Sequence, residues 1–166
     1  MNKAKSSGFT YLGLIFIFTI LSITAALAGS LWSFAQKREK ERQLLFVGHQ
    51  FRRAIGNYYE KTPGVIKRYP ANLQELLQDN RYVSTQRYLR RIYLDPMTGS
   101  AEWGTISAPT GGIMGVYSKS EEKPVKTGNF SLKDIFFEQQ ANYSDWKFIY
   151  APVIILQNNS NNPSLN

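Results

Sequence analysis

The hydrophobic pattern of the chain changes character at Gln36. From Phe9 to Phe34 there are 26 residues without a charged side chain. At a helical rise of about 1.5 Å per residue they cover roughly 39 Å, enough to cross a hydrocarbon layer of about 30 Å. The run is longer than the apolar stretch of about 7 to 15 residues in a general secretory signal peptide. We therefore expect residues 9–36 to form the membrane-spanning half of a long helix.

Beyond Gln36 the helical pattern continues but becomes amphipathic. Residues 37–61 contain no proline, and apolar residues recur there at intervals of three and four, the spacing of one helix face. The stripe comprises Leu44, Leu45, Val47, Phe51, Ile55, Tyr58 and Tyr59. Proline fits poorly inside a helix, so Pro63 ends it. We expect residues 37–61 to anchor the chain's own globular domain through this stripe.

Residues 62–156 have the pattern of one small α+β domain. Asn72 is placed to cap a short helix over QELLQD, with Leu73, Leu76 and Leu77 on its inner face. Short segments rich in aromatic and β-branched residues predict antiparallel strands. They span 101–107, 112–118 and 145–151. The fold class is α+β, with the long helix packed on a small antiparallel sheet of three or four strands.

A tight turn is predicted at Asp95-Pro96-Met97-Thr98-Gly99. An aspartate side chain can bond back to the backbone, proline fixes one dihedral, and glycine tolerates a positive φ. Asp95 is therefore interpreted as a residue that shapes a turn rather than as a catalytic acid.

The net charge of +8 is concentrated near the long helix. Residues 1–61 hold nine Lys or Arg against three acids, whereas residues 62–166 hold eleven against nine. Basic residues beside a membrane segment indicate an interface with anionic head groups or acidic neighbours. A surface that binds single-stranded nucleic acid combines basic and aromatic side chains. In this sequence they interleave only where Arg87, Arg90 and Arg91 occur near Tyr82, Tyr88 and Tyr93. No nucleic-acid partner is expected.

Catalytic constellations are missing from the sequence. There is no cysteine, which excludes disulfides and thiolate sites, and His49 is the only histidine. His49 is interpreted as a helix-surface residue or a subunit contact. The glycines at 111, 112 and 115 lack the Gly-Lys-Ser/Thr of a phosphate loop. We predict that the chain is not an enzyme.

The N-terminal sequence MNKAKSSGFTYLGL joins a short basic leader to the apolar run. Gly8 is followed by Phe9, Thr10, Leu12 and Leu14. This pattern resembles the class III signal of type IV prepilins and type II secretion pseudopilins. The resemblance implies a leader at 1–8, cleavage between Gly8 and Phe9 by a prepilin peptidase, and N-methylation of Phe9.

The chain departs from that family at Gly13, where a glutamate is usual. The family's glutamate is thought to pair with the free amine of a neighbouring subunit inside the membrane, where a lone charge costs at least about 2.5–3.5 kcal/mol. Phe9, Thr10, Gly13 and Leu14 are thus the assembly residues that the resemblance implies. With Gly13 the subunit can offer its own Phe9 amine to the glutamate of a partner, but it cannot neutralise the amine of another subunit. This predicts a minor or specialised subunit. Alternatively the glutamate is dispensable here, and Gly13 lets two helices approach closely.

The resemblance extends into residues 62–156, where it implies a pilin-like fold. The motifs that carry it are Tyr69, Pro70, Leu73, Asp95, Pro96, Gly99, Trp103 and Trp146. Major pseudopilins of this kind hold calcium through carboxylates and carbonyls, so calcium is the one cofactor that the resemblance allows. The acids available are Glu121, Glu122, Asp134, Glu138 and Asp145, and lysines interrupt them. We expect Glu121 and Glu122 to lie in a solvated turn, and no metal ligand is assigned.

The resemblance implies a pseudopilin subunit of a type II secretion filament. The chain would cross the bacterial inner membrane once, with its C-terminal domain in the periplasm. Expected partners are other pseudopilin subunits, the prepilin peptidase, the inner-membrane secretion platform and membrane lipid. One alternative is a minor type IV pilin for adhesion, motility or DNA uptake. Another is a soluble exported binding module, because Ala26-Leu27-Ala28 resembles a signal peptidase site. Residues 157–166 are predicted to be a flexible polar tail.

Overall fold

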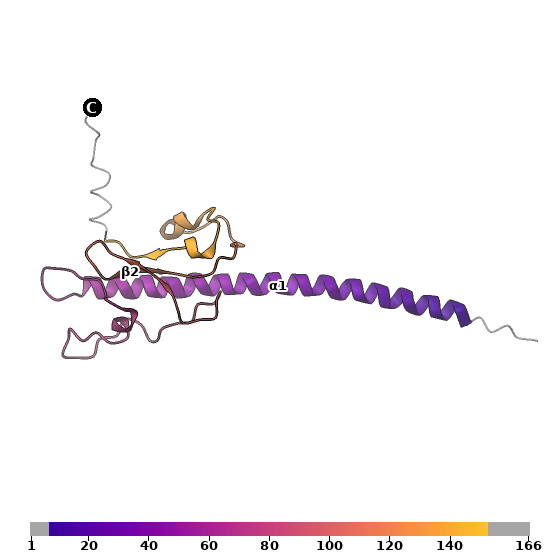
Figure 1. The fold of residues 1–166 in the computed structure, drawn as a ribbon, viewed down its shortest axis with the longest axis horizontal. Helices are drawn as coiled ribbons and strands as arrows, with labels where there is room; N and C mark the ends of the chain where they lie inside the picture. Colours follow the sequence, from indigo (N-terminus) through magenta and orange to yellow (C-terminus); the bar gives the residue numbers. More distant parts are fainter. Residues whose placement is uncertain (1–6, 153–166) are drawn as a thin grey trace, which may run out of the picture. The chain divides into compact units, whose positions relative to one another are not determined.

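The computed structural model describes residues 7–152, except for the side chains of 7–10 and 25–31. The elements are α1 (Ser7–Glu60), η1 (Leu73–Leu76), β1 (Gly104–Ser107), β2 (Ile113–Tyr117), η2 (Leu132–Phe137), η3 (Tyr143–Asp145) and β3 (Phe148–Ile149) (Figure 1). The chain divides into two compact units, one up to Glu39 and one from Lys40 onward. The predicted α+β class is confirmed. The predicted tail at 157–166 lies outside the described residues.

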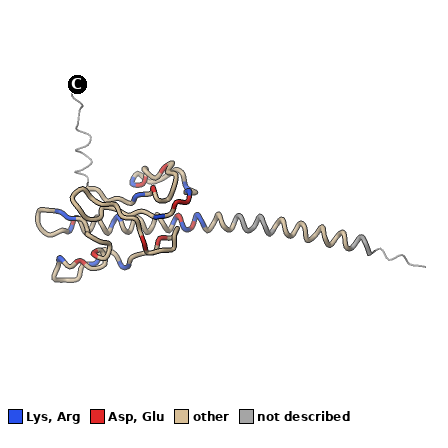
Figure 2. Tube along the Cα trace, in the orientation of Figure 1, with Lys and Arg blue, Asp and Glu red and all other residues tan. Residues whose placement is uncertain are grey.

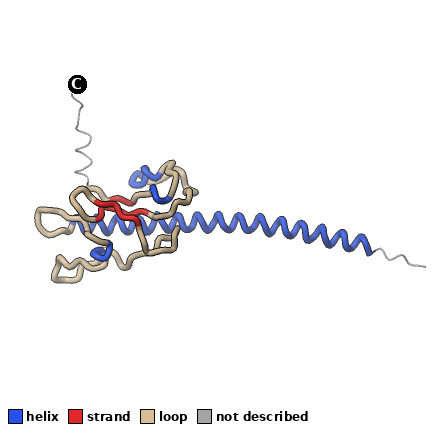
Figure 3. The backbone as a smooth tube through the Cα atoms, in the orientation of Figure 1, coloured by secondary structure: helices blue, strands red, loops and turns tan. Residues whose placement is uncertain are grey.

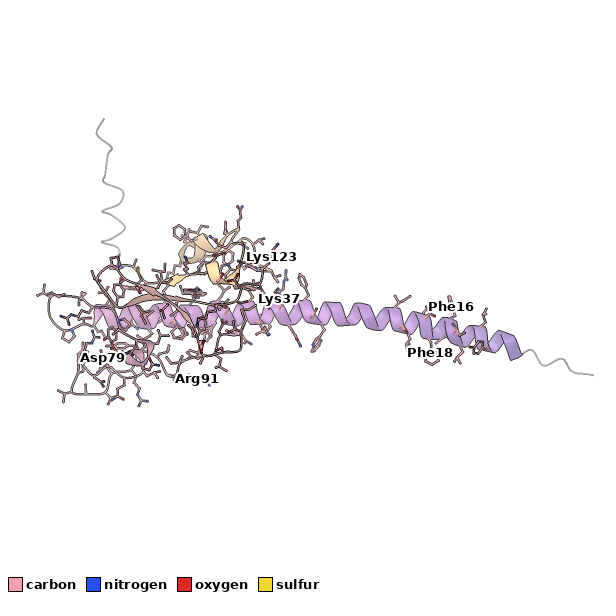
Figure 4. The ribbon with its side chains drawn as sticks, in the orientation of Figure 1. Phe16, Phe18, Lys37, Asp79, Arg91 and Lys123 are labelled. Atoms are coloured by element: carbon pink, nitrogen blue, oxygen red, sulfur yellow. The ribbon has the colours of Figure 1, made fainter. Side chains whose placement is uncertain are left out.

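The first unit consists of the beginning of α1. Its described side chains from Tyr11 to Thr24 are all exposed, and Phe16 and Phe18 project to opposite sides of the helix (Figure 4). No charged residue occurs along α1 before Lys37 in the described part of the chain (Figure 2). Within the residues that the structure describes, no helix is both long enough and apolar enough to span a membrane.

The C-terminal end of α1 lies close to the predicted position. The helix ends at Glu60, and Pro63 and Gly64 follow with Gly64 at a φ of 83°. The Thr62 hydroxyl donates to the carbonyl of Tyr58 at 3.1 Å. A side chain thus satisfies one of the carbonyls that a helix end leaves without a partner.

The second unit covers the outer half of α1 with a three-stranded antiparallel sheet in the order β1-β2-β3 (Figure 3). Gly104 pairs with Tyr117 and Val116 with Phe148. The three predicted strands are all present, but each is shorter than expected. β3 has two residues because η3 ends just before it and Pro152, which cannot donate to a ladder, follows shortly after.

The predicted apolar stripe of α1 forms the core of the second unit. Leu44, Phe51 and Ile55 are fully buried, while Leu45 and Tyr59 are partly buried against the same cluster. The opposing side chains are mostly aromatic; the rings of Phe137 and Trp146 stack with their centroids 5.4 Å apart. Aromatic burial therefore supplies much of the apolar area that holds the sheet to the helix.

Two glycines of α1 determine how closely β3 approaches. A Cβ added at Gly48 would lie closer than 3.0 Å to the ring of Phe148, and one at Gly56 would lie 2.7 Å from the ring of Tyr150. Gly48 is buried and Phe148 is fully buried. The helix-weakening glycines in this part of α1 thus permit close packing.

The short helices agree with the sequence only in part. Asn72 caps η1 as predicted, because its side chain accepts a hydrogen bond from the Glu75 amide at 3.1 Å. Leu76 is buried, with Leu73 and Leu77 partly buried, but η1 is a single 3-10 turn. The sequence did not predict η2 and η3, which interrupt the segment expected to be a loop before β3.

We expect Gly48→Ala to destabilise the second unit by about 1–3 kcal/mol, the usual cost of overpacking a core. The new methyl group meets a ring that Phe137 and β2 hold in place, so the gain in helix propensity does not offset the clash. Denaturant unfolding of the full chain, followed by tryptophan fluorescence, measures the change. Gly128→Ala is the matched control, since a Cβ there meets nothing within 4 Å. Equal stability of the two variants would contradict the prediction.

Candidate functional site

The predicted processing and assembly residues lie at the start of α1. Gly8, Phe9 and Thr10 belong to its first turns, but their side chains lie outside the described residues. A Cβ at Gly13 would meet nothing within 4 Å in the described structure, and Leu14 is exposed. The described structure therefore places Gly13 and Leu14 on an open helix surface.

The hydroxyl groups in this part of α1 are bonded within the helix. Thr19 and Ser22 each donate to the carbonyl four residues earlier at 2.8 Å, and Thr24 does so at 3.1 Å. A Ser or Thr side chain bonded in this way presents less polarity to its surroundings. The exposed surface of the helix from Tyr11 to Thr24 is thus apolar in practice.

Asp95 shapes the predicted turn and also joins it to β2. Its carboxylate accepts hydrogen bonds from the Met97 amide at 2.9 Å and the Ser118 hydroxyl at 2.7 Å. The Gly99 amide donates to the Asp95 carbonyl at 2.7 Å, and Gly99 has a φ of 73°. Asp95 is completely buried. These bonds show that Asp95 forms the predicted turn.

The other fold motifs also support the packing around α1. The Tyr69 ring lies 4.5 Å from the Tyr59 ring, and the Pro70 carbonyl accepts from the Ile113 amide at 2.7 Å. The Trp103 indole donates to the Tyr93 carbonyl at 2.8 Å. Pro96 lies in the Asp95 turn and is partly buried. These motifs join covering segments to the helix and to one another.

A cluster around Asp134 attaches η2 to α1. The Asp134 carboxylate, 4% exposed, accepts from Arg52 Nη1 at 2.8 Å and from Ser131 Oγ at 2.8 Å, and His49 Nε2 lies 2.8 Å from its Oδ2. Burial raises the pKa of Asp134, but the hydrogen bonds from Arg52 and Ser131 outweigh it and hold the pKa below its usual value. His49 therefore makes a contact within its own chain.

This cluster contains the residue types of a catalytic triad but not its order. Ser131 and His49 both contact Asp134 Oδ2. In a triad the serine hydroxyl bonds to the imidazole, which then takes its proton, and the aspartate lies behind the imidazole. The observed arrangement orients side chains between α1 and η2 and does not activate Ser131.

A second cluster lies at the C-terminal end of α1, around Asp79 (Figure 4). Arg81 donates to both carboxylate oxygens of Asp79 at 2.7 and 2.8 Å, to the Tyr58 carbonyl at 3.0 Å and to Thr62 Oγ1 at 2.8 Å. Burial raises the pKa of Asp79, but hydrogen bonds from Arg81 and Tyr88 outweigh it and keep the pKa low. Burial and the same carboxylate raise the pKa of Tyr88 to about 12. Arg81 thereby holds the segment after η1 against the end of the helix.

A fourth buried carboxylate, Glu41, was not predicted. It accepts from the amides of Val125 at 2.9 Å and Lys126 at 3.1 Å, and from the Tyr143 hydroxyl at 2.9 Å. Burial and this hydrogen bond raise the pKa of Tyr143. One sequence signal was present: Glu41 stands three residues before Leu44, on the same face of α1 as the apolar stripe.

The arginine and tyrosine cluster has little capacity left to stack nucleobases. The Tyr58 and Tyr88 rings lie 5.7 Å apart, and the Tyr88 hydroxyl bonds to Asp79. The Tyr82 hydroxyl bonds to the Lys61 carbonyl. The Tyr93 ring packs edge-on against Phe51 at 6.3 Å. These tyrosines serve the fold.

Three of the acids considered for calcium are used elsewhere in the fold. Asp134 is paired with Arg52, Asp145 caps η3 by accepting from the Asn142 amide at 3.2 Å, and Glu138 accepts from the Phe130 amide at 3.4 Å. Glu121 and Glu122 are exposed. Among the described residues, no three His, Cys, Asp or Glu side chains form a group that could hold a metal ion.

Comparison of the chain with protein-family models, curated proteins and solved structures finds no match.

Stability should fall in acid because the pKa values of Asp79 and Asp134 are lower in the folded protein than in the unfolded chain. A depressed pKa contributes stability that is fully present above the unfolded value of about 4 and is lost as the pH falls through the folded value. Denaturant unfolding from pH 7 to pH 2.5 should show this loss below about pH 4.

Asp79→Asn tests the same linkage. Removing one partner of a buried ion pair should lower the stability at pH 7 by about 3–5 kcal/mol and flatten the profile below pH 4. Glu121→Gln, which changes an exposed carboxylate, is the control and should follow the unmodified protein. An unchanged acid slope in Asp79→Asn would show that Asp79 does not carry the effect.

Proposed function

We propose that the chain is a pseudopilin-like structural subunit of a type II secretion filament. Residues 9–36 would anchor it in the bacterial inner membrane, and the domain from residue 37 onward would lie in the periplasm. The observation that carries the proposal is the junction at Gly8-Phe9-Thr10, where a basic leader meets 26 uncharged residues. This junction resembles the site at which prepilin peptidases cut.

The surface of α1 in the first unit is suited to an apolar environment, which supports the proposal. Its described apolar side chains are exposed, and the hydroxyls of Thr19, Ser22 and Thr24 are bonded to the helix backbone. Lipid chains or neighbouring helices would cover these three hydroxyls without leaving them unsatisfied. This is what a subunit needs if its helix moves from a bilayer into a filament core.

The second unit supports a pilin-like arrangement. The outer half of α1 buries one stripe under a three-stranded antiparallel sheet, and buried carboxylates tie the connecting segments to the same helix. A domain held this firmly on its own helix can transmit force along the helix. The proposed role is mechanical: subunits added at the inner-membrane platform advance the filament, and a separate motor supplies the ATP hydrolysis.

The first test is the intact mass and N-terminal sequence of the full chain after membrane extraction from a host that contains a prepilin peptidase. The expected product begins at N-methylated Phe9. Gly8→Ala should block this processing and leave the leader attached, with Ser7→Ala as the matched control. A product that begins at Gly29 would contradict the proposal and support a soluble exported module.

Filament type needs a second observation, because a minor type IV pilin would show the same processing. Immunogold labelling of cells should detect the chain in short periplasmic structures rather than in surface fibres. Labelled surface fibres would favour the minor pilin and overturn the secretion assignment.

Gly13→Glu tests the proposed role as a minor subunit. The new carboxylate would neutralise the Phe9 amine of a neighbouring copy, so the variant should form homopolymers that the unmodified chain does not form. Cross-linking of membranes after overexpression measures the homopolymers, and Gly13→Gln controls for side-chain size. Unchanged incorporation with no new homopolymer would contradict the minor-subunit proposal.

A further inference from the structure

The positive charge of the second unit is concentrated in residues 61–93. This segment holds seven Lys or Arg and two acids, Glu75 and Asp79, whereas residues 94–152 hold five Lys and seven acids. Both acids of the basic segment are used internally. Glu75 accepts from the Tyr58 hydroxyl at 2.5 Å, and Asp79 is paired with Arg81. With seven cations and two carboxylates, the segment carries a net charge of +5.

Three arginines of the segment face solvent. Arg87, Arg90 and Arg91 are exposed, and Figure 4 shows Arg91 on the outer side of this segment. Arg91 lies 5.3 Å from the ring of Tyr93. Within the part of the chain that the structure describes, no carboxylate pairs with any of the three. Their guanidinium groups are therefore available for an external anion.

Exposed aliphatic side chains occupy two neighbouring loops of the same segment. Val65 is 97% exposed, Ile66 is 73% exposed, and Val83 is fully exposed. Arg81 holds the two loops together through Thr62, and the Tyr82 hydroxyl does so through the Lys61 carbonyl. A pocket of about 370 Å³ lies where the first loop meets Arg81. Large aliphatic side chains at loop tips gain free energy only if an apolar phase receives them.

We propose that residues 61–93 form a docking surface for an anionic lipid bilayer. Val65, Ile66 and Val83 enter the boundary between head groups and acyl chains, while Arg87, Arg90 and Arg91 bind lipid phosphates. Buried apolar area and attraction to anionic lipid both add to the strength of binding at a membrane surface. Nucleic acid fits less well because the tyrosine rings are packed within the fold. An acidic protein would pair with the arginines but would also need a separate apolar pocket for each protruding aliphatic tip.

A flotation experiment tests the proposal with the full chain held in neutral phosphatidylcholine nanodiscs, which keep the apolar start of α1 out of the vesicles. The probes are vesicles of phosphatidylcholine alone or with phosphatidylglycerol. We expect binding to the anionic vesicles only, weakening as salt is added. This docking is independent of the proposed secretion role, because it would survive a failure of processing at Gly8.

Matched variants locate the surface. Arg87, Arg90 and Arg91 changed together to Gln should weaken binding by about 100-fold, at roughly fivefold for each cation near the bilayer. Changing Lys123, Lys133 and Lys147 together to Gln removes the same charge from exposed positions outside the segment and should change binding less than threefold. Equal losses would overturn the proposal, since they would show attraction by net charge alone.

The aliphatic contribution needs its own variant. Val65→Ser with Val83→Ser keeps the charge and should weaken vesicle binding about tenfold. If this variant binds vesicles normally, the lipid proposal fails. It also fails if polyglutamate or poly(dT) binds the unmodified chain more tightly than the vesicles do, and an acidic protein or nucleic-acid partner would then replace the lipid. All substituted side chains are exposed, and tryptophan fluorescence would check that each variant is folded.

Discussion

The contact between Gly48 of α1 and the ring of Phe148 is the constraint on which the second unit depends. Phe148 belongs to the two-residue strand β3, which pairs with β2, and β2 pairs with β1. The same ring lies 5.0 Å from Phe137. The distance between the helix and β3 therefore sets the position of the whole sheet. A side chain larger than that of glycine at position 48 would push away both the sheet and the aromatic cluster.

Three buried carboxylates fix the orientation that this contact leaves open. Each holds a different covering segment. Glu41 holds residues 125 and 126 together with η3, Asp134 holds η2, and Asp79 holds the turn after η1. Buried ion pairs add little net stability compared with apolar packing, but breaking one leaves an uncompensated charge. Their effect here is that a shifted helix register would separate Glu41 and Asp134 from their partners. It would also separate Arg81, which Asp79 holds in place, from the Tyr58 carbonyl. Apolar burial supplies the affinity between helix and cover, and the carboxylates select one arrangement.

The sequence predicted what depends on local patterns. Periodicity revealed the stripe from Leu44 to Tyr59. Pro63 indicated the helix end, Asn72 indicated the cap, and Asp95 with Gly99 indicated the turn. The sequence did not reveal η2, η3 or the role of Glu41, because the partners of Glu41 lie 84 or more residues away. Asp134 was considered as a calcium ligand for the same reason, since nothing local indicates that Arg52 lies beside it. Assembly through Phe9 and Gly13 would require other subunits, and no single chain contains that information.

Burial in the two units differs in a way that bears on assembly. Ten large apolar or aromatic side chains between Tyr11 and Ile23 are exposed in the first unit. At about 1.5–3 kcal/mol for each side chain fully buried, the free energy available from covering them is comparable with the 5–15 kcal/mol that stabilises a typical domain. Lipid chains and protein surfaces provide this free energy of burial almost equally. It therefore favours an apolar environment without favouring contact between helices. In a bilayer, association would then depend on close packing and charge. Under the proposed role, Gly13 would remove a carboxylate but leave room for a neighbouring backbone, so close packing would become the principal means of recognising neighbouring subunits.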